Sequence, residues 1–143
     1  MSNIAETIVH ASCVTVRGRG VLITGASGSG KSALALSLMA LGAGLVADDR
    51  VILNLRQGRV MASAPAPIRG LVEARGIGLL NAGAHGPVPV DLVVDLDRTE
   101  QERLPHKHQT VLLGQSLTLL YRVEGSHFPA ALVQFLKAGR RGD

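Results

Sequence analysis

Aromatic residues are almost absent from this sequence: its 143 residues include two phenylalanines, one tyrosine and no tryptophan. Proteins that bind single-stranded nucleic acid commonly stack bases on aromatic side chains, so we expect no nucleic-acid partner. Apolar residues nevertheless make up 46% of the chain, which argues against a disordered protein. The core is therefore expected to consist of Val, Leu, Ile and Ala.

Cysteine is equally scarce, because Cys13 is the only one. A single cysteine forms no disulfide within the chain, which fits a reduced cytoplasmic setting. Its apolar neighbours indicate a buried and unreactive thiol. No apolar segment reaches the roughly 18 residues of a membrane span, and the first residues do not resemble a signal peptide. We therefore expect a cytoplasmic protein with no membrane partner.

Acidic residues are fewer than basic ones, 11 against 15, which gives a net charge of +4. A positive charge favours anions such as nucleotides or acidic protein surfaces, but it does not choose among them. The length is that of one domain and is sufficient to bury a core. We expect a single domain over residues 1–143.

The sequence does contain a glycine-rich motif, GASGSGKS, at residues 25–32. It fits G-x-x-x-x-G-K-[ST], the pattern of a loop (a P-loop) that holds the phosphates of a nucleoside triphosphate. A short apolar strand at 21–23 precedes it and strong helix formers at 31–41 follow it, as such a loop requires. The residues expected to bind nucleotide phosphates are Gly25, Ala26, Ser27, Gly28, Ser29, Gly30, Lys31 and Ser32. In this pattern the lysine contacts the outer phosphates, and the final serine hydroxyl is a Mg²⁺ ligand.

Helices are few elsewhere: the pattern predicts about seven strands and only two helices, at residues 31–41 and 128–138. Residues 6–17 are expected to form one strand, residues 51–55 and 59–61 a hairpin, and residues 68–81 resist assignment. A wholly parallel sheet needs a helix for nearly every crossover, and this chain does not supply them. We therefore predict an α/β fold with a mixed sheet that holds one P-loop.

Phosphoryl transfer also needs a carboxylate, to hold the metal or to accept a proton. Asp48 and Asp49 end the strand at 45–47, and Asp95 ends another. A lone aspartate after a strand is often only a turn former, whereas an adjacent pair is harder to explain in that way. In an extended chain the two side chains diverge, so one can face the phosphates while the other supports it. We rank Asp48 and Asp49 above Asp95.

Other candidates remain open between a structural and a functional interpretation. His10, on the first predicted strand, is either an ordinary histidine of the sheet or part of the site. Glu73 and Arg75 are either a surface ion pair of little consequence or a metal-binding carboxylate beside a phosphate-binding guanidinium.

Several segments together resemble the catalytic domain of HPr kinase/phosphorylase. They are HASCVTVRGRGVLITGASGSGKS, GLVADDRV, IRGLVEARGIGLLN and VDLVVDLD, in the order of that family and over about residues 8–137. The V-A-D-D-R and E-x-R-G-x-G motifs are more specific than the P-loop. The resemblance implies a mixed sheet related to phosphoenolpyruvate carboxykinase. It also implies the truncated form found in α-proteobacteria, which lacks the N-terminal domain of the full-length family.

By this resemblance, the protein transfers the γ-phosphoryl group of ATP to a serine of an HPr-type phosphocarrier of the phosphotransferase system, with Mg²⁺. The reverse reaction with inorganic phosphate would give pyrophosphate. The family also forms hexamers, which implies a homo-oligomer.

The resemblance also implies a role for individual residues. Ser32 and Glu73 would ligate Mg²⁺, and Asp48 would act as general base with support from Asp49. The other residues to which it assigns a catalytic role are His10, the active-site histidine, Arg75, in the signature that closes the site, and Arg103, in a mobile loop.

Two other classes of function remain as alternatives. One is a P-loop small-molecule kinase or nucleotide hydrolase. The guanine motif N-K-x-D of GTPases is absent, and only Arg98 and Arg103 lie where a small-molecule kinase would have a lid of several arginines. The other is a non-catalytic nucleotide sensor. The intact residues that argue against it are Lys31, Ser32, Asp48, Asp49 and Glu73.

Overall fold

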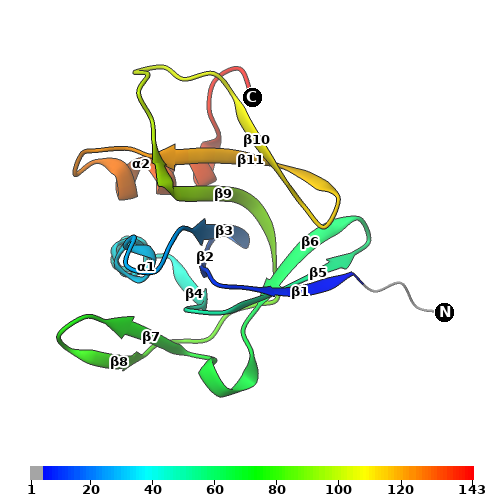
Figure 1. The fold of residues 1–143 in the computed structure, drawn as a ribbon, viewed down its shortest axis with the longest axis vertical. Coiled ribbons are helices and arrows are strands. Elements are labelled where there is room, and N and C mark those ends of the chain that lie inside the picture. Colours follow the sequence, from blue (N-terminus) through cyan, green and yellow to red (C-terminus); the bar gives the residue numbers. More distant parts are fainter. Residues whose placement is uncertain (1–4) are drawn as a thin grey trace.

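The computed structural model describes residues 5–143. Within this range the chain forms eleven strands, two α-helices and one 3₁₀ turn (Figure 1). The elements are β1 (Glu6–Val9), β2 (Ser12–Val16), β3 (Arg19–Thr24), α1 (Lys31–Ala40), β4 (Gly44–Ala47), β5 (Val51–Arg56), β6 (Arg59–Ser63), η1 (Ala66–Ile68), β7 (Leu71–Ala74), β8 (Gly78–Asn81), β9 (Val88–Thr99), β10 (His108–Leu112), β11 (Gln115–Arg122) and α2 (Phe128–Ala138).

The main sheet is mixed, as predicted. Its strands follow the order β10, β11, β9, β3, β2, β4, and β9 pairs in parallel with both β3 and β11 while the other pairs are antiparallel. The beginning of β9 also pairs with β6, which continues through β5 to β1. Strands β7 and β8 form a separate two-stranded hairpin.

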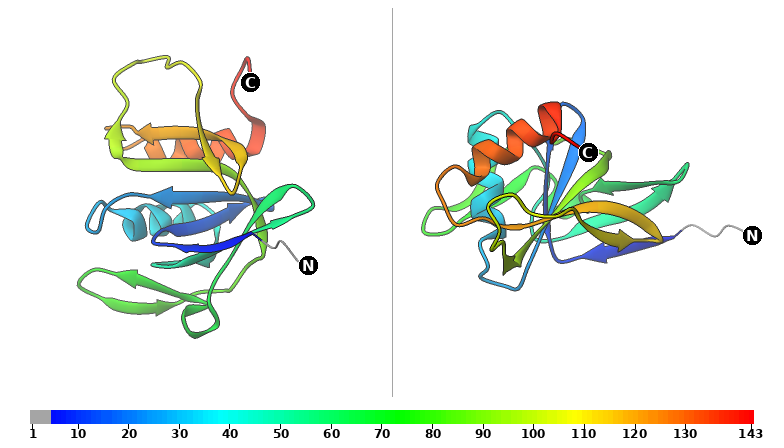
Figure 2. Two further views of the ribbon diagram at one scale, coloured as in Figure 1. Left: turned by 45° about the vertical axis from the view of Figure 1, so that its right-hand side comes forward. Right: turned by 90° about the horizontal axis from the view of Figure 1, so that it is seen from above.

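Buried side chains alternate between two cores on opposite faces of the central strands. Val21 and Ile23 of β3 pack with residues of α1 and α2, whereas Leu22 between them packs with residues of β4, β5 and β6. β9 alternates in the same way, with Val94 on the helix side and Val93 on the other. The arrangement is seen from two further directions in Figure 2. The parallel strands β3 and β9 therefore contribute side chains to both cores. This follows because successive side chains of a strand point to opposite faces and both faces of this sheet are covered.

The structure corrects the prediction in its shorter elements. Residues 6–17 are not one strand, because the chain breaks at His10 and Ala11 so that β1 can pair with β5 while β2 pairs with β3 and β4. The unassigned segment 68–81 contains the β7–β8 hairpin, whose exposed apolar residues hide the usual alternation. The helix at 128–138 is confirmed at both ends.

One edge of the sheet collects the ends of several strands. Because β3, β9 and β11 are parallel, their carboxyl ends meet there. β4 also ends at this edge, since it is antiparallel to β2, which is antiparallel to β3. Ligands in α/β proteins commonly bind at such an edge. No helix within residues 5–143 is long and apolar enough to span a membrane.

Candidate functional site

The glycine-rich loop, residues 25–30, connects β3 to α1 at this edge. Gly25, Gly28 and Gly30 have φ of 150°, 82° and 103°, which side chains rarely tolerate. A Cβ on Gly25 would also lie 2.5 Å from the Ser29 Oγ. Gly30 is the N-cap of α1, so the positive end of the helix faces the same space as the loop.

Lys31 lies beneath the loop and is only 7% exposed. Its ammonium donates hydrogen bonds to the backbone carbonyls of Gly25 at 2.8 Å and Ala26 at 3.0 Å. Within the described residues these bonds go to carbonyls rather than to a carboxylate, so the positive charge of the ammonium is not neutralised. An anion held by the loop would meet this charge.

Asp48 follows β4 and is 5% exposed. One carboxylate oxygen accepts hydrogen bonds from the hydroxyls of Ser12 at 2.6 Å and Ser32 at 2.8 Å. The other accepts from Ser32 at 2.9 Å and from the backbone N–H of Glu73 at 3.0 Å. Asp48 thus joins the start of β2, the start of α1 and the β7–β8 hairpin.

Asp49, the next residue, is exposed. Its φ of 75° turns the chain at the end of β4 and leaves the side chain 62% exposed. The carboxylate lies 2.9 Å from the Nε2 of His10 and 3.7 Å from the Nε of Arg50. The two adjacent carboxylates therefore occupy a buried and an exposed position.

A cavity of about 590 Å³ joins these groups. The predicted residues that line it are His10, Ser27, Gly28, Gly30, Lys31, Ser32, Asp49, Glu73 and Arg75. Glu73 and Arg75 reach it because the β7–β8 hairpin packs beside α1. Asp48 does not line the cavity itself, but its carboxylate accepts hydrogen bonds from Ser12 and Ser32, which both do.

The structure does not bring every predicted residue to this cavity. Arg103 is exposed in the segment between β9 and β10, which extends from the sheet on the side opposite the β7–β8 hairpin (Figure 1). Two residues that the sequence did not single out do contact the site: Ser12 binds Asp48, and Asp97 accepts the N–H of Ala26. Alternation along a strand could not have indicated either residue, because the chain breaks between β1 and β2 just before Ser12, and the pairing of β9 with β11 shifts register just after Asp95.

The cavity offers few protein ligands for a Mg²⁺ ion. Residues 5–143 contain no group of three or more His, Cys, Asp or Glu side chains that could hold a metal. Mg²⁺ is commonly held by one or two protein oxygens together with substrate phosphates and water. The Ser32 hydroxyl, its neighbour Asp48 and the Glu73 side chain in the same cavity fit that requirement.

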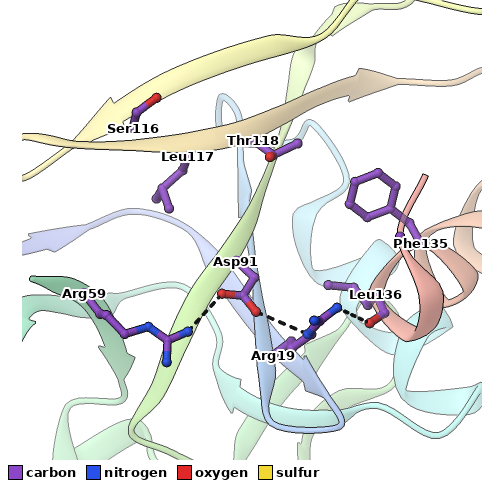
Figure 3. Close-up of a pocket in the computed structure, with 9 residues that line it drawn as sticks. Arg19, Arg59, Asp91, Ser116, Leu117, Thr118, Phe135 and Leu136 are labelled. Atoms are coloured by element: carbon purple, nitrogen blue, oxygen red, sulfur yellow. Dashed lines mark hydrogen bonds and ion pairs between the residues drawn. The ribbon is translucent and has the colours of Figure 1, made fainter. Parts of the chain in front are cut away.

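A second cavity, of about 440 Å³, lies at the other end of β3 and β9 (Figure 3). There Asp91 lies between two guanidinium groups, 3.3 Å from Arg59 and 3.6 Å from Arg19. Arg19 also donates to the backbone carbonyl of Leu136 at 2.9 Å. Its charged groups are thus already paired, in contrast to the ammonium of Lys31.

The fold and the site place the chain in a class of α/β proteins. In this class a large mixed sheet carries a glycine-rich strand–loop–helix unit. Residues 2–111 match the family described as the HPr serine kinase C-terminal domain. The chain belongs to this family.

Curated relatives agree with this assignment. HPr kinase/phosphorylase of Acidovorax sp. (strain JS42) is 39% identical over 144 residues, 90% of this chain and 45% of the relative. The protein of the same name from Verminephrobacter eiseniae (strain EF01-2) is 36% identical with the same coverage. The chain therefore spans about 45% of the length of these relatives.

A solved structure shows the same fold. The Hpr(Ser) kinase/phosphatase from Coxiella burnetii superimposes with a TM-score of 0.77 over 92% of this chain and 88% of that one. The two sequences are 23% identical in this comparison, so the likeness concerns the fold alone.

Proposed function

We propose that this chain is an ATP- and Mg²⁺-dependent serine kinase that phosphorylates an HPr-type phosphocarrier protein of the phosphotransferase system. Membership of the family supports the substrate class. The observation that carries the proposal is that Lys31 and Ser32 line one cavity while Asp48 lies directly behind Ser32 and binds its hydroxyl. Within the described residues, the ammonium of Lys31 is bonded to carbonyls and to no carboxylate. Phosphoryl transfer needs these three functions: a cation for the phosphates, a hydroxyl for the metal and a carboxylate.

The glycine-rich loop and Lys31 would bind the phosphates of ATP. Ser32 and Glu73 would hold Mg²⁺, which when bound would neutralise charge that develops on the phosphate oxygens. Arg75 would add a second positive charge at the hairpin side of the cavity. The chain's own contribution is to fix the phosphates against the start of α1.

Asp48 would be the general base. It already accepts hydrogen bonds from two hydroxyl groups, and a substrate serine is a donor of the same kind. In the transfer, the serine oxygen would bond to the γ-phosphorus, the bond from that phosphorus to ADP would break, and the serine proton would pass to Asp48. Asp49 would support Asp48, and His10, which contacts Asp49, would be the active-site histidine that the family resemblance implies.

The proposal extends to further properties that the family resemblance implies. They are kinship of the sheet with phosphoenolpyruvate carboxykinase, a single catalytic domain over residues 1–143, a cytoplasmic location, a homo-oligomeric assembly, and the reverse reaction with phosphate that yields pyrophosphate. Arg103 keeps the role that the resemblance implies, although it does not line the cavity.

The test is a transfer assay with γ-labelled ATP, Mg²⁺ and purified HPr-type carriers, followed by identification of the labelled residue. We expect label on one serine, and pyrophosphate when phosphate is added to the labelled carrier. Lys31→Ala should abolish transfer, because the phosphates lose their cation. Lys107→Ala is the matched control, since Lys107 lies outside the cavity lining and its ammonium binds Gly142 and Asp143 near the end of the chain.

Three results would contradict the proposal. Label on a small molecule would indicate a small-molecule kinase, release of free phosphate alone a nucleotide hydrolase, and ATP binding without turnover a sensor. An active Lys31→Ala variant would remove the assignment of the glycine-rich loop.

A further inference from the structure

The glycine-rich loop has a second side, which faces β9 and β11 rather than the cavity. On this side the N–H of Ala26 donates to both oxygens of Asp97, at 2.9 and 3.1 Å. The backbone carbonyl of Ser29 accepts a hydrogen bond from Nη2 of Arg122. The loop is thus contacted near both of its ends by side chains that the proposed function does not use.

A register shift between β9 and β11 positions the side chains of Asp97 and Arg122 at the loop. Asp95 of β9 pairs with Tyr121 of β11, but the next residue, Arg122, pairs with Thr99. Residues 96–98 of β9 therefore have no partners in β11 and form a bulge. The N–H of Asp97 donates to the Asp95 carboxylate at 2.9 Å, which fixes the bulge from within.

Arg122 connects the bulge to the loop. Its Nε donates to the carbonyl of Leu96 at 3.1 Å, while Nη2 reaches Ser29. The side chain is half-buried, and within residues 5–143 it forms no ion pair. A planar guanidinium can bind two acceptors at fixed angles, so it holds the two carbonyls at a fixed separation.

We propose that Asp97 and Arg122 form a clamp that holds the glycine-rich loop in its phosphate-binding shape before the nucleotide arrives. Both are positioning residues, because neither lines the cavity. The inference rests on the proposed binding of a nucleoside triphosphate by this loop and names the residues that determine its affinity.

The physical reason is the cost of ordering the loop. Its three glycines with positive φ have many accessible conformations, and residues 26–28 are exposed. A loop that is already held by charge-assisted hydrogen bonds does not have to be ordered at the moment of binding. Without the clamp, the loop has to be ordered when the nucleotide binds, and the entropy lost in that step lowers the affinity.

The experiment compares the wild type with Arg122→Gln and Asp97→Ala by calorimetric titration of Mg²⁺-ATP. We expect the dissociation constant to rise about tenfold in each, as the loss of one charge-assisted hydrogen bond implies. Turnover at saturating ATP should fall much less, because the loop is ordered once the nucleotide is bound. Arg19→Gln is the matched control, since Arg19 also donates to a backbone carbonyl but at the other end of β3.

Arg122→Lys separates the clamp from a simple effect of charge. It keeps the positive charge but cannot bind two carbonyls in one plane, so it should restore only part of the affinity. Full restoration by lysine would overturn the clamp. Unchanged affinity in Arg122→Gln and Asp97→Ala, in protein that melts as the wild type does, would also overturn it.

Hydrogen exchange of the loop amides in nucleotide-free protein tests the clamp without relying on nucleotide binding. The N–H of Ser29 donates to the carbonyl of Ala26 at 3.0 Å, and its exchange should accelerate about tenfold in Arg122→Gln. Exchange at Ala26 should accelerate similarly in Asp97→Ala, because its N–H loses its acceptor. Unchanged exchange would remove the clamp even if the wild type binds ATP. If the wild type binds no ATP but exchange accelerates, the clamp stands and the proposed function fails.

Discussion

At the residue scale, Asp48 is the group whose surroundings are most specific. Its carboxylate accepts hydrogen bonds from three donors, the hydroxyls of Ser12 and Ser32 and the backbone N–H of Glu73, in a nearly solvent-free position. A buried carboxylate with this many donors connects three separate parts of the chain. It therefore contributes both to the proposed chemistry and to the local structure.

Replacement of Asp48 by asparagine tests these contributions separately. The amide cannot accept a proton from a serine, so the transfer rate should fall about 10²- to 10⁴-fold, the usual contribution of a general base. Because an amide NH₂ would replace one acceptor oxygen, the free energy of unfolding should also fall, by about 1–3 kcal/mol. Transfer assays and urea unfolding measure the two effects.

Asp49→Asn is the control for this change, since Asp49 is exposed and bonded to His10. We expect its stability to match the wild type and its rate to fall less than that of Asp48→Asn. Near-normal transfer by Asp48→Asn would exclude Asp48 as the base.

Glu73 can be tested through the metal. Its side chain lines the cavity while its backbone N–H binds Asp48, so Glu73→Gln should keep the backbone contact and lose only the charged ligand. We expect the Mg²⁺ concentration for half-maximal activity to rise about tenfold or more. An unchanged metal titration would assign Glu73 a purely structural role.

Cys13 predicts a pH dependence of stability. Burial raises the pKa of its thiol from the ordinary value of 9.0 to about 12. Between these values the folded protein keeps a proton that the unfolded chain releases, so the free energy of unfolding should fall as the pH rises, by up to about 1.4 kcal/mol per pH unit. Urea unfolding from about pH 8 to pH 11 measures the slope, and Cys13→Ala should lack this component. Equal slopes in the two proteins would contradict the prediction.

At the element scale, the β7–β8 hairpin is separate from the main sheet. Among the described residues its two strands pair with each other alone, and Ile77 and Leu79 near its tip are 76% and 68% exposed. It nevertheless carries Glu73 and Arg75 to the cavity. A segment with few buried apolar contacts opens at a lower free energy than a core strand.

We therefore expect the amides of residues 71–81 to exchange with solvent faster than those of β3 and β9, by about a hundredfold or more. Mg²⁺-ATP should slow this exchange, because Glu73 and Arg75 then acquire partners. Hydrogen exchange followed by mass spectrometry measures both effects. Equal protection of the hairpin and the central strands would contradict the first expectation, and no response to Mg²⁺-ATP the second.

At the scale of the whole molecule, the two cores share their central strands. Residues on alternate positions of β3 and β9 belong to the helix-side core and to the opposite core, so neither can lose its packing while the other remains. The described chain should therefore unfold in one cooperative transition. Far-ultraviolet circular dichroism and calorimetry should give coincident midpoints, whereas two separate transitions would show that the cores are independent.

Much of the fold could be predicted because its signals are local. Helix formers after Gly30, the turn at Arg56-Gln57-Gly58 and the amphipathic segment 128–138 act over a few residues, and the structure has the expected elements there. The excess of strands over helices likewise predicted a mixed sheet. The break at His10 could not be predicted in this way, because it depends on which distant strand each half of the segment pairs with.

The sequence by itself indicated the class of chemistry that we propose, since the order of residues in GASGSGKS and the adjacency of Asp48 and Asp49 can be read without knowledge of distant contacts. Only the tertiary structure decided which side chains meet. It placed Asp48 against Ser12 and Ser32, left Asp49 exposed with His10, kept Arg103 away from the cavity, and brought Asp97 and Arg122 behind the loop. The reason is that these contacts arise from strand direction and from a bulge between parallel strands, which are properties of pairing between segments far apart in the chain.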